Sequence, residues 1–173
     1  QIPEETDVKS DARKAGFKTI CEIGKERIRR AGSKIKDDSP LTTANLDVGF
    51  RVLKCDSSNM KDVYYNPAEY EPSLFSRLED NIKEDRTPED LLFQVMLDLG
   101  VLLSSKIEET TISGKKVFNV EDNYLIACFD DNVTDEVITE IAKQKPYYFV
   151  MRDSSMANDS VATNFEQIFA AYS

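Results

Sequence analysis

The sequence predicts an α+β (or α/β) fold, with a mixed sheet of about five strands flanked by helices and preceded by a basic amphipathic helix. Three observations lead to this prediction. Short runs rich in β-branched and aromatic residues alternate with helical patterns. The order strand, helix, strand between Tyr124 and Arg152 indicates a parallel crossover. A hairpin pattern just before it adds antiparallel strands.

The first predicted element is a helix over residues 17 to 36. Its apolar residues recur every three or four positions and form one stripe, while most of its lysines and arginines lie on other faces. Pro40 disfavours helical geometry at the residue before it, so we expect the helix to end over residues 37 to 39. The stripe consists of Phe17, Ile20, Cys21, Gly24, Ile28, Ala31 and Ile35.

The middle of the chain is predicted to hold one buried strand and two helices. Residues 48 to 55 are β-rich and apolar at most positions, which indicates a buried strand. Residues 73 to 82 form a short helical pattern. The next helix starts with Thr87 as N-cap and Pro88 at the first helical position, and it continues to residue 103. We expect this helix, the most apolar in the chain, to be the central one.

The C-terminal part is predicted to contain the hairpin, the crossover and a final helix. The dipeptide Ser113-Gly114 is typical of a hairpin turn. In order, the elements are strands over 107–112, 116–120 and 124–129, a helix that Thr134 caps and Pro146 stops, a strand over 147–152 and a helix over 160–172.

The charge is distributed unevenly along the chain. Residues 9 to 36 contain ten basic and three acidic residues, whereas 12 basic and 25 acidic residues follow from Asp38 onward. Such asymmetry indicates two regions of different origin. We therefore expect an N-terminal region over 1–37, a linker over 38–47 and a C-terminal α+β domain over 48–173.

Composition narrows the possible functions. The net charge of −10 argues against DNA binding by the whole surface. The sequence has no histidine, and therefore lacks the commonest general base and the commonest metal ligand. No metal site is expected, and the apolar runs are too short for a transmembrane helix, so no membrane partner is expected. The three cysteines, Cys21, Cys55 and Cys128, are predicted to be buried free thiols in a reducing cytoplasm.

Two segments invite a catalytic interpretation, but their patterns favour ordinary turns. The segment 66–70, Asn-Pro-Ala-Glu-Tyr, is close to the loop with which amino methyltransferases hold the target amine, yet Ala68 and Glu69 break that pattern. Asp130 and Asp131 follow a predicted strand and are of the type that binds Mg²⁺, but no partner carboxylates stand at a suggestive spacing. A solvated turn is the expected structure there.

Nucleic-acid contacts have two candidate sets of residues. Arg27, Arg29, Arg30 and Lys34 of the basic helix are of the type that contacts phosphates, although a solvated helix face is the favoured interpretation. The two tyrosine pairs, at 64–65 and 147–148, are able to stack on bases, but core or interface packing is the favoured interpretation.

Four stretches, over residues 20–31, 50–54, 85–92 and 149–164, are similar to segments of one family. The last stretch contains Arg152-Asp153-Ser154-Ser155 and the element over 159–164. The family consists of the modification (Mod) subunits of bacterial type III restriction-modification systems. These subunits are adenine-specific DNA methyltransferases. The resemblance extends over nearly the whole chain.

The resemblance implies that the chain is the C-terminal piece of a longer parent, as does its lack of an initiating Met. The target-base loop and the glycine-rich cofactor loop would both lie upstream. Residues 1–37 would be the tail of the Rossmann-like methyltransferase domain. Gln1 resembles the position that commonly binds the ribose of S-adenosylmethionine, so it would be a remnant of the cofactor site. No cofactor is expected in the chain itself.

The first hypothesis is therefore a non-catalytic C-terminal domain of a type III DNA adenine-N6 methyltransferase. Its expected role is subunit assembly, either in a Mod homo-oligomer or in docking the restriction subunit. The parent would be an enzyme located in the cytoplasm, and it would be the part of the protein that contacts DNA. The alternative is an accessory DNA-binding module that contacts phosphates through the basic helix.

Overall fold

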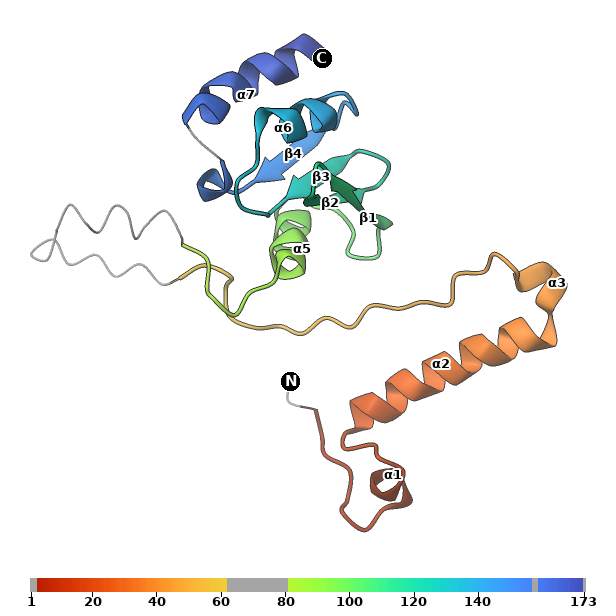
Figure 1. Ribbon diagram of the computed structural model, residues 1–173. Coiled ribbons are helices and arrows are strands. Elements are labelled where there is room, and N and C mark those ends of the chain that lie inside the picture. The colour runs from red at the N-terminus through yellow and green to blue at the C-terminus, as the bar shows by residue number, and fades with distance from the viewer. Residues whose placement is uncertain (1–2, 62–80, 157–158, 173) are drawn as a thin grey trace, which may run out of the picture. The chain divides into compact units, whose positions relative to one another are not determined.

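Figure 1 shows the computed structural model, which describes residues 3–61, 81–156 and 159–172. The chain divides into two compact units, Gln1–Lys54 (unit 1) and Cys55–Ser173 (unit 2). Gln1, the segment 66–70 and most of the helix predicted over 73–82 lie outside the described residues.

Unit 1 contains the predicted basic helix. It appears as α2 (Ile20–Asp38), between the short helices α1 (Asp11–Lys14) and α3 (Pro40–Thr43). The helix starts after Thr19 because Thr19 and Glu22 form a capping box, in which each side chain accepts a hydrogen bond from the backbone N–H of the other. The predicted end before Pro40 is confirmed, but Pro40 occupies the first turn of α3, so the expected linker is partly helical.

The strand predicted over residues 48–55 is wrong. The structure contains no strand there, and Phe50, Val52 and Leu53 are 37%, 49% and 48% exposed. A strand is stable only when a neighbouring strand binds its backbone groups, and no described segment pairs with this one. Its apolar composition was therefore an insufficient signal, since β-propensity depends on the surroundings.

Unit 2 is built on a mixed sheet of four strands in the order β1-β2-β3-β4. The strands are β1 (Ile107–Ile112), β2 (Lys115–Val120), β3 (Leu125–Cys128) and β4 (Tyr148–Met151). The α+β fold class is confirmed, with one strand fewer than predicted. The hairpin between β1 and β2 turns at Ser113 and Gly114, whose φ values of +46° and +79° suit a tight two-residue turn. The crossover is also confirmed, because β3 and β4 pair in parallel.

Helices cover both faces of this sheet, which gives three layers (Figure 1). Helix α5 (Pro88–Asp98) packs on one face through Leu92 and Met96. Helices α6 (Asp135–Ala142) and α7 (Asp159–Tyr172) cover the other face. Successive residues of β3 point to opposite layers, since Leu125 and Ala127 join the α5 core, while Ile126 and Cys128 join the α6–α7 core. Buried on both faces, β3 is apolar throughout.

The cysteine prediction is correct for one residue out of three. Cys128 is a buried free thiol, and burial raises its pKa above the ordinary value of 9.0. Cys21 and Cys55 are free but exposed, because Cys21 lies on α2 and Cys55 follows the unpaired segment 48–54. Among the described residues, no helix is both long and apolar enough to span a membrane.

Candidate functional site

The four basic residues proposed for phosphate contact all lie on α2, but they do not form one surface. Arg27, Arg30 and Lys34 are spaced by three and four residues, so they follow one side of the helix. Arg29 lies on another side, where its guanidinium carbon is 5.7 Å from the ring centre of Phe50. A row of three exposed cations therefore remains as the candidate phosphate surface.

Glu26 reduces the positive charge of this row. Its Oε1 accepts a hydrogen bond from Nε of Arg30 at 2.8 Å, and its Oε2 lies 3.7 Å from Nη1 of Arg29. The pKa of Glu26 lies below its ordinary value of 4.5, chiefly because Arg30 donates this hydrogen bond. A phosphate approaching Arg30 would have to compete with that carboxylate.

The aspartates considered as Mg²⁺ ligands have structural partners instead. Oδ2 of Asp130 accepts a hydrogen bond from the backbone N–H of Lys116 at 2.7 Å. The backbone carbonyl of Asp131 accepts one from Nζ of Lys115 at 2.6 Å, and Oδ1 of Asp131 lies 3.6 Å from Nη1 of Arg152. In the part of the chain that the structure describes, no group of three or more metal-ligating side chains is found.

The segment after β4 fastens the loops at the carboxyl ends of β3 and β4. The carbonyl of Ser155 accepts a hydrogen bond from the N–H of Val133 at 2.7 Å, and Val133 forms a parallel bridge with Met156. On α7, Nδ2 of Asn164 donates to Oδ2 of Asp135 at 3.1 Å. These residues connect β3, α6, β4 and α7.

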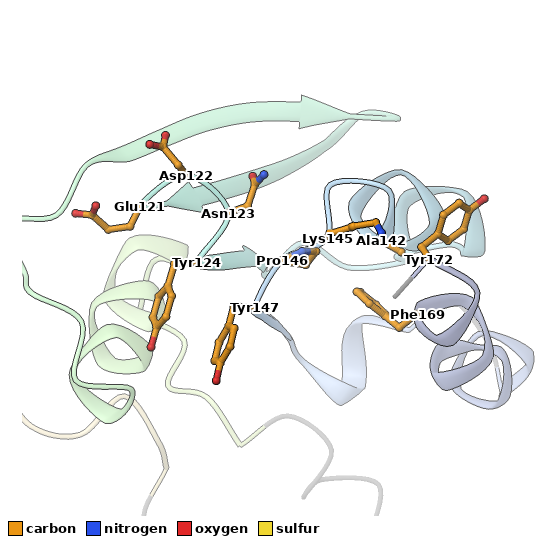
Figure 2. Close-up of a pocket in the computed structure, with 10 residues that line it drawn as sticks. All are labelled: Glu121, Asp122, Asn123, Tyr124, Ala142, Lys145, Pro146, Tyr147, Phe169 and Tyr172. Carbon is orange, nitrogen blue, oxygen red and sulfur yellow. The ribbon is translucent and has the colours of Figure 1, made fainter.

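A groove of about 650 Å³ lies at the opposite edge of the sheet, where β3 and β4 begin (Figure 2). Four segments contribute to it: the turn before β3, the end of α6, the residues before β4 and the last turns of α7. The lining residues are Glu121, Asp122, Asn123, Tyr124, Ala142, Lys145, Pro146, Tyr147, Phe169 and Tyr172.

The turn before β3 is held in an unusual backbone conformation. Glu121, Asp122 and Asn123 have positive φ values of 51°, 47° and 73°. Two hydrogen bonds between the side chain of Asn119 and residue 123 hold the turn, and Nδ2 of Asn123 donates to the carbonyl of Gln144 at 3.2 Å. The acidic side chains are thus presented from a well-connected turn.

Three tyrosines form a cluster on the same edge. The rings of Tyr124 and Tyr147 are stacked, with centroids 5.4 Å apart and an interplanar angle of 5°. The ring of Tyr148 meets Tyr124 and Tyr147 edge-on, at 5.5 and 4.8 Å. Tyr147 is 73% exposed, so the core packing that was one of its two expected environments is wrong, and packing at an interface stays a prediction. The pair at 64–65 lies outside the described residues.

Tyr147 and Tyr148 are prominent in the sequence, whereas the groove beside them is a feature of the tertiary structure. The groove exists because β3 and β4 pair in a register that sets Leu125 opposite Tyr148, and this brings Tyr124 beside Tyr147. A register between two strands that are separated by a helix leaves no local signal in the sequence. The one local sign of the groove was that residues 121–123 and Pro146 are of types that are common in exposed turns.

No protein-family model matches the chain, and no curated protein is similar enough to identify it.

Proposed function

We propose that this chain is the non-catalytic C-terminal module of the Mod subunit of a type III restriction-modification system, and that it serves subunit assembly. Its partner is a second Mod subunit or the restriction subunit. The parent, a cytoplasmic bacterial enzyme, transfers a methyl group from S-adenosylmethionine to N6 of adenine in DNA. The module itself binds neither the cofactor nor the target base.

The structural use of the resembling segments supports this assignment. Arg152 and Ser155 belong to one of the stretches that resemble the family, residues 149–164, and they bind the loop that follows β3. Asn164, at the end of that stretch, binds Asp135 at the start of α6. Thr87 and Asp90, in another such stretch, form the capping box of α5. Residues that are used in this way build a scaffold.

The observation that carries the assembly role is the exposed, stacked pair of Tyr124 and Tyr147. Tyrosine is enriched at protein interfaces because it offers a large apolar ring with a polar tip. A ring already held by stacking loses little conformational freedom when a partner covers it. The edge that carries these rings also contains the groove, so we propose this edge as the contact surface.

Sedimentation velocity tests the assignment. The chain is run alone and mixed with purified type III modification and restriction subunits, and we expect a complex in at least one sample. Tyr147→Ser should weaken that complex more than tenfold, as expected when a central interface aromatic is truncated. Leu102→Ser is the matched control, because Leu102 is also 73% exposed but lies after α5. Absence of any complex would refute the assembly role.

Calorimetry with S-adenosylmethionine tests the non-catalytic part of the proposal. We expect no binding heat from the chain at millimolar cofactor. A micromolar dissociation constant would contradict the assignment, because it would place a cofactor site within these 173 residues.

The second candidate function is DNA binding through α2, which the alignment of Arg27, Arg30 and Lys34 on one side of the helix favours. Each phosphate contact that is removed should lower the slope of log K against log salt by about one. A fluorescence anisotropy titration with duplex DNA at two salt concentrations, with Lys34→Gln as variant, measures this slope. Absence of binding at low salt removes this candidate.

A further inference from the structure

The groove combines aromatic walls with an acidic rim. Figure 2 shows Glu121 and Asp122 on the side of the tyrosine pair, with Phe169 and Tyr172 on the opposite side. Lys145 is the single cation among the lining residues, against two carboxylates. The chain from Asp38 onward carries 25 acidic and 12 basic residues. The surroundings therefore favour a cationic ligand over an anionic one.

One face of Tyr147 is open to a ligand. Its other face lies against Tyr124, and the two rings are almost parallel. Tyr148 lies 5.5 Å from Tyr124 and 4.8 Å from Tyr147, so it sits beside the stacked pair and does not cover the outer face of Tyr147. This geometry agrees with the 73% exposure of Tyr147. An open tyrosine face attracts a cation through the ring quadrupole.

The two carboxylates are available near this ring. Oε1 of Glu121 accepts one hydrogen bond, from the backbone N–H of Lys106 at 3.3 Å, which leaves its second oxygen for another donor. The amino group of Lys106 is paired with Glu108 at 2.6 Å. Asp122 is exposed and forms no salt bridge with any residue in the described ranges, and it and Glu121 contribute only secondarily, after Glu108, to the raised pKa of Lys106. Each carboxylate can therefore accept hydrogen bonds from an incoming donor.

We propose that the groove receives an arginine side chain from the partner subunit, with its guanidinium stacked on Tyr147 and paired with Asp122 or Glu121. Arginine fits better than lysine because its planar guanidinium stacks on an aromatic face and presents a fork of donors to a carboxylate. This inference rests on the proposed assembly function and names the contact that the tyrosine edge makes.

The test follows amide and tyrosine ring resonances of the full chain by NMR during titration with the peptide acetyl-Gly-Arg-Gly-Arg-Gly-amide. The matched probe replaces both arginines by citrulline, which keeps the shape and removes the charge. We expect shifts confined to residues 121–124 and 145–148, and citrulline should bind about five- to thirtyfold more weakly.

Three variants separate the ring from the carboxylate. Tyr147→Leu and Asp122→Asn should each weaken arginine binding severalfold, whereas Tyr147→Phe should keep it because the aromatic face remains. Glu166→Gln on α7 is the control for a lost surface charge, and it should leave binding unchanged.

Equal binding of the arginine and citrulline peptides, or shifts outside the groove, would overturn the inference. So would an oligothymidine that shifts the tyrosine resonances while the peptide does not, because base stacking would then explain the rings. If Tyr147→Ser breaks the complex in sedimentation but the peptide does not bind, the assembly function stands and only the arginine contact fails.

Discussion

Lys116 on β2 joins the sheet to α5 through Glu89, whose Oε1 lies 2.6 Å from the lysine Nζ. The same ammonium group lies 3.0 Å from Oε2 of Glu109 on β1, and 4.9 Å from the ring centre of Phe118. One cation thus connects two strands with the first turn of the helix that covers them. These neighbours raise the pKa of Lys116, chiefly through the hydrogen bond to Glu89.

The Glu89–Lys116 pair predicts a defined pH dependence of stability. The pKa of Glu89 is lowered from its ordinary 4.5, first by Lys116, so the contribution is present above 4.5 and is lost as pH falls through the folded-state pKa. The raised pKa of Lys116 means that the contribution is present below 10.5 and is lost as pH rises through the folded-state value. Because both side chains are partly exposed, we expect Glu89→Gln to cost about 0.5 kcal/mol at pH 7.

Urea denaturation of this variant at pH 7 and pH 3 measures the effect. The difference from the wild type should be smaller at pH 3 than at pH 7, because the wild-type carboxyl group takes up a proton as pH falls through its lowered pKa. Glu166→Gln, at an exposed position on α7, should show no difference at either pH. An equal deficit at both pH values would show that Glu89 acts through packing and not through its charge.

The two threonines at helix starts should differ in their contribution to stability. Thr87 Oγ1 accepts a hydrogen bond from the N–H of Asp90 at 3.3 Å, so Thr87→Ala should lower the free energy of unfolding by about 1 kcal/mol. Thr134 occupies the N-cap of α6, as predicted, but its side chain makes no capping hydrogen bond. Thr134→Ala should therefore cost much less in the same denaturation experiment, and a larger loss than for Thr87→Ala would contradict the geometry.

Two glycines of α2 should respond differently to alanine. A methyl group on Gly24 meets nothing within 4 Å, so Gly24→Ala should stabilise the helix by about 0.5–1 kcal/mol. A methyl group on Gly32 would lie 2.9 Å from Cβ of Val48, and we expect this overlap to cancel the gain. Thermal unfolding followed by circular dichroism at 222 nm compares the two. Equal gains would mean that Val48 does not pack on Gly32.

Two of the three thiols should be reactive, and the third should be protected. Cys21 and Cys55 are exposed, whereas Cys128 is buried and its pKa is raised by desolvation. In the native state, a thiol-disulfide reagent at pH 8 should modify Cys21 and Cys55 within minutes and Cys128 only at the rate of unfolding. Mass spectrometry identifies the modified residues. Rapid reaction of Cys128 would indicate that the α6–α7 layer opens.

Most of the secondary structure of unit 2 could be predicted from local signals. Ser113 and Gly114 indicated the hairpin, Thr87 and Pro88 indicated the start of α5, and the strand–helix–strand order indicated the parallel pair. Each of these signals depends on the conformational preference of a few neighbouring residues, so it is visible in one sequence. The same holds for α2, whose apolar spacing and Thr19 cap are local features.

Tertiary structure decided the features that depend on distant partners. Residues 48–55 have the composition of a strand, but no described strand lies beside them to bind their backbone groups. Lys116 meets Glu89, and Tyr124 stacks on Tyr147, only because the sheet register brings them together. Composition and spacing thus determined which elements form, whereas strand pairing over long sequence separations determined which side chains meet, because those contacts depend on packing that no local preference encodes.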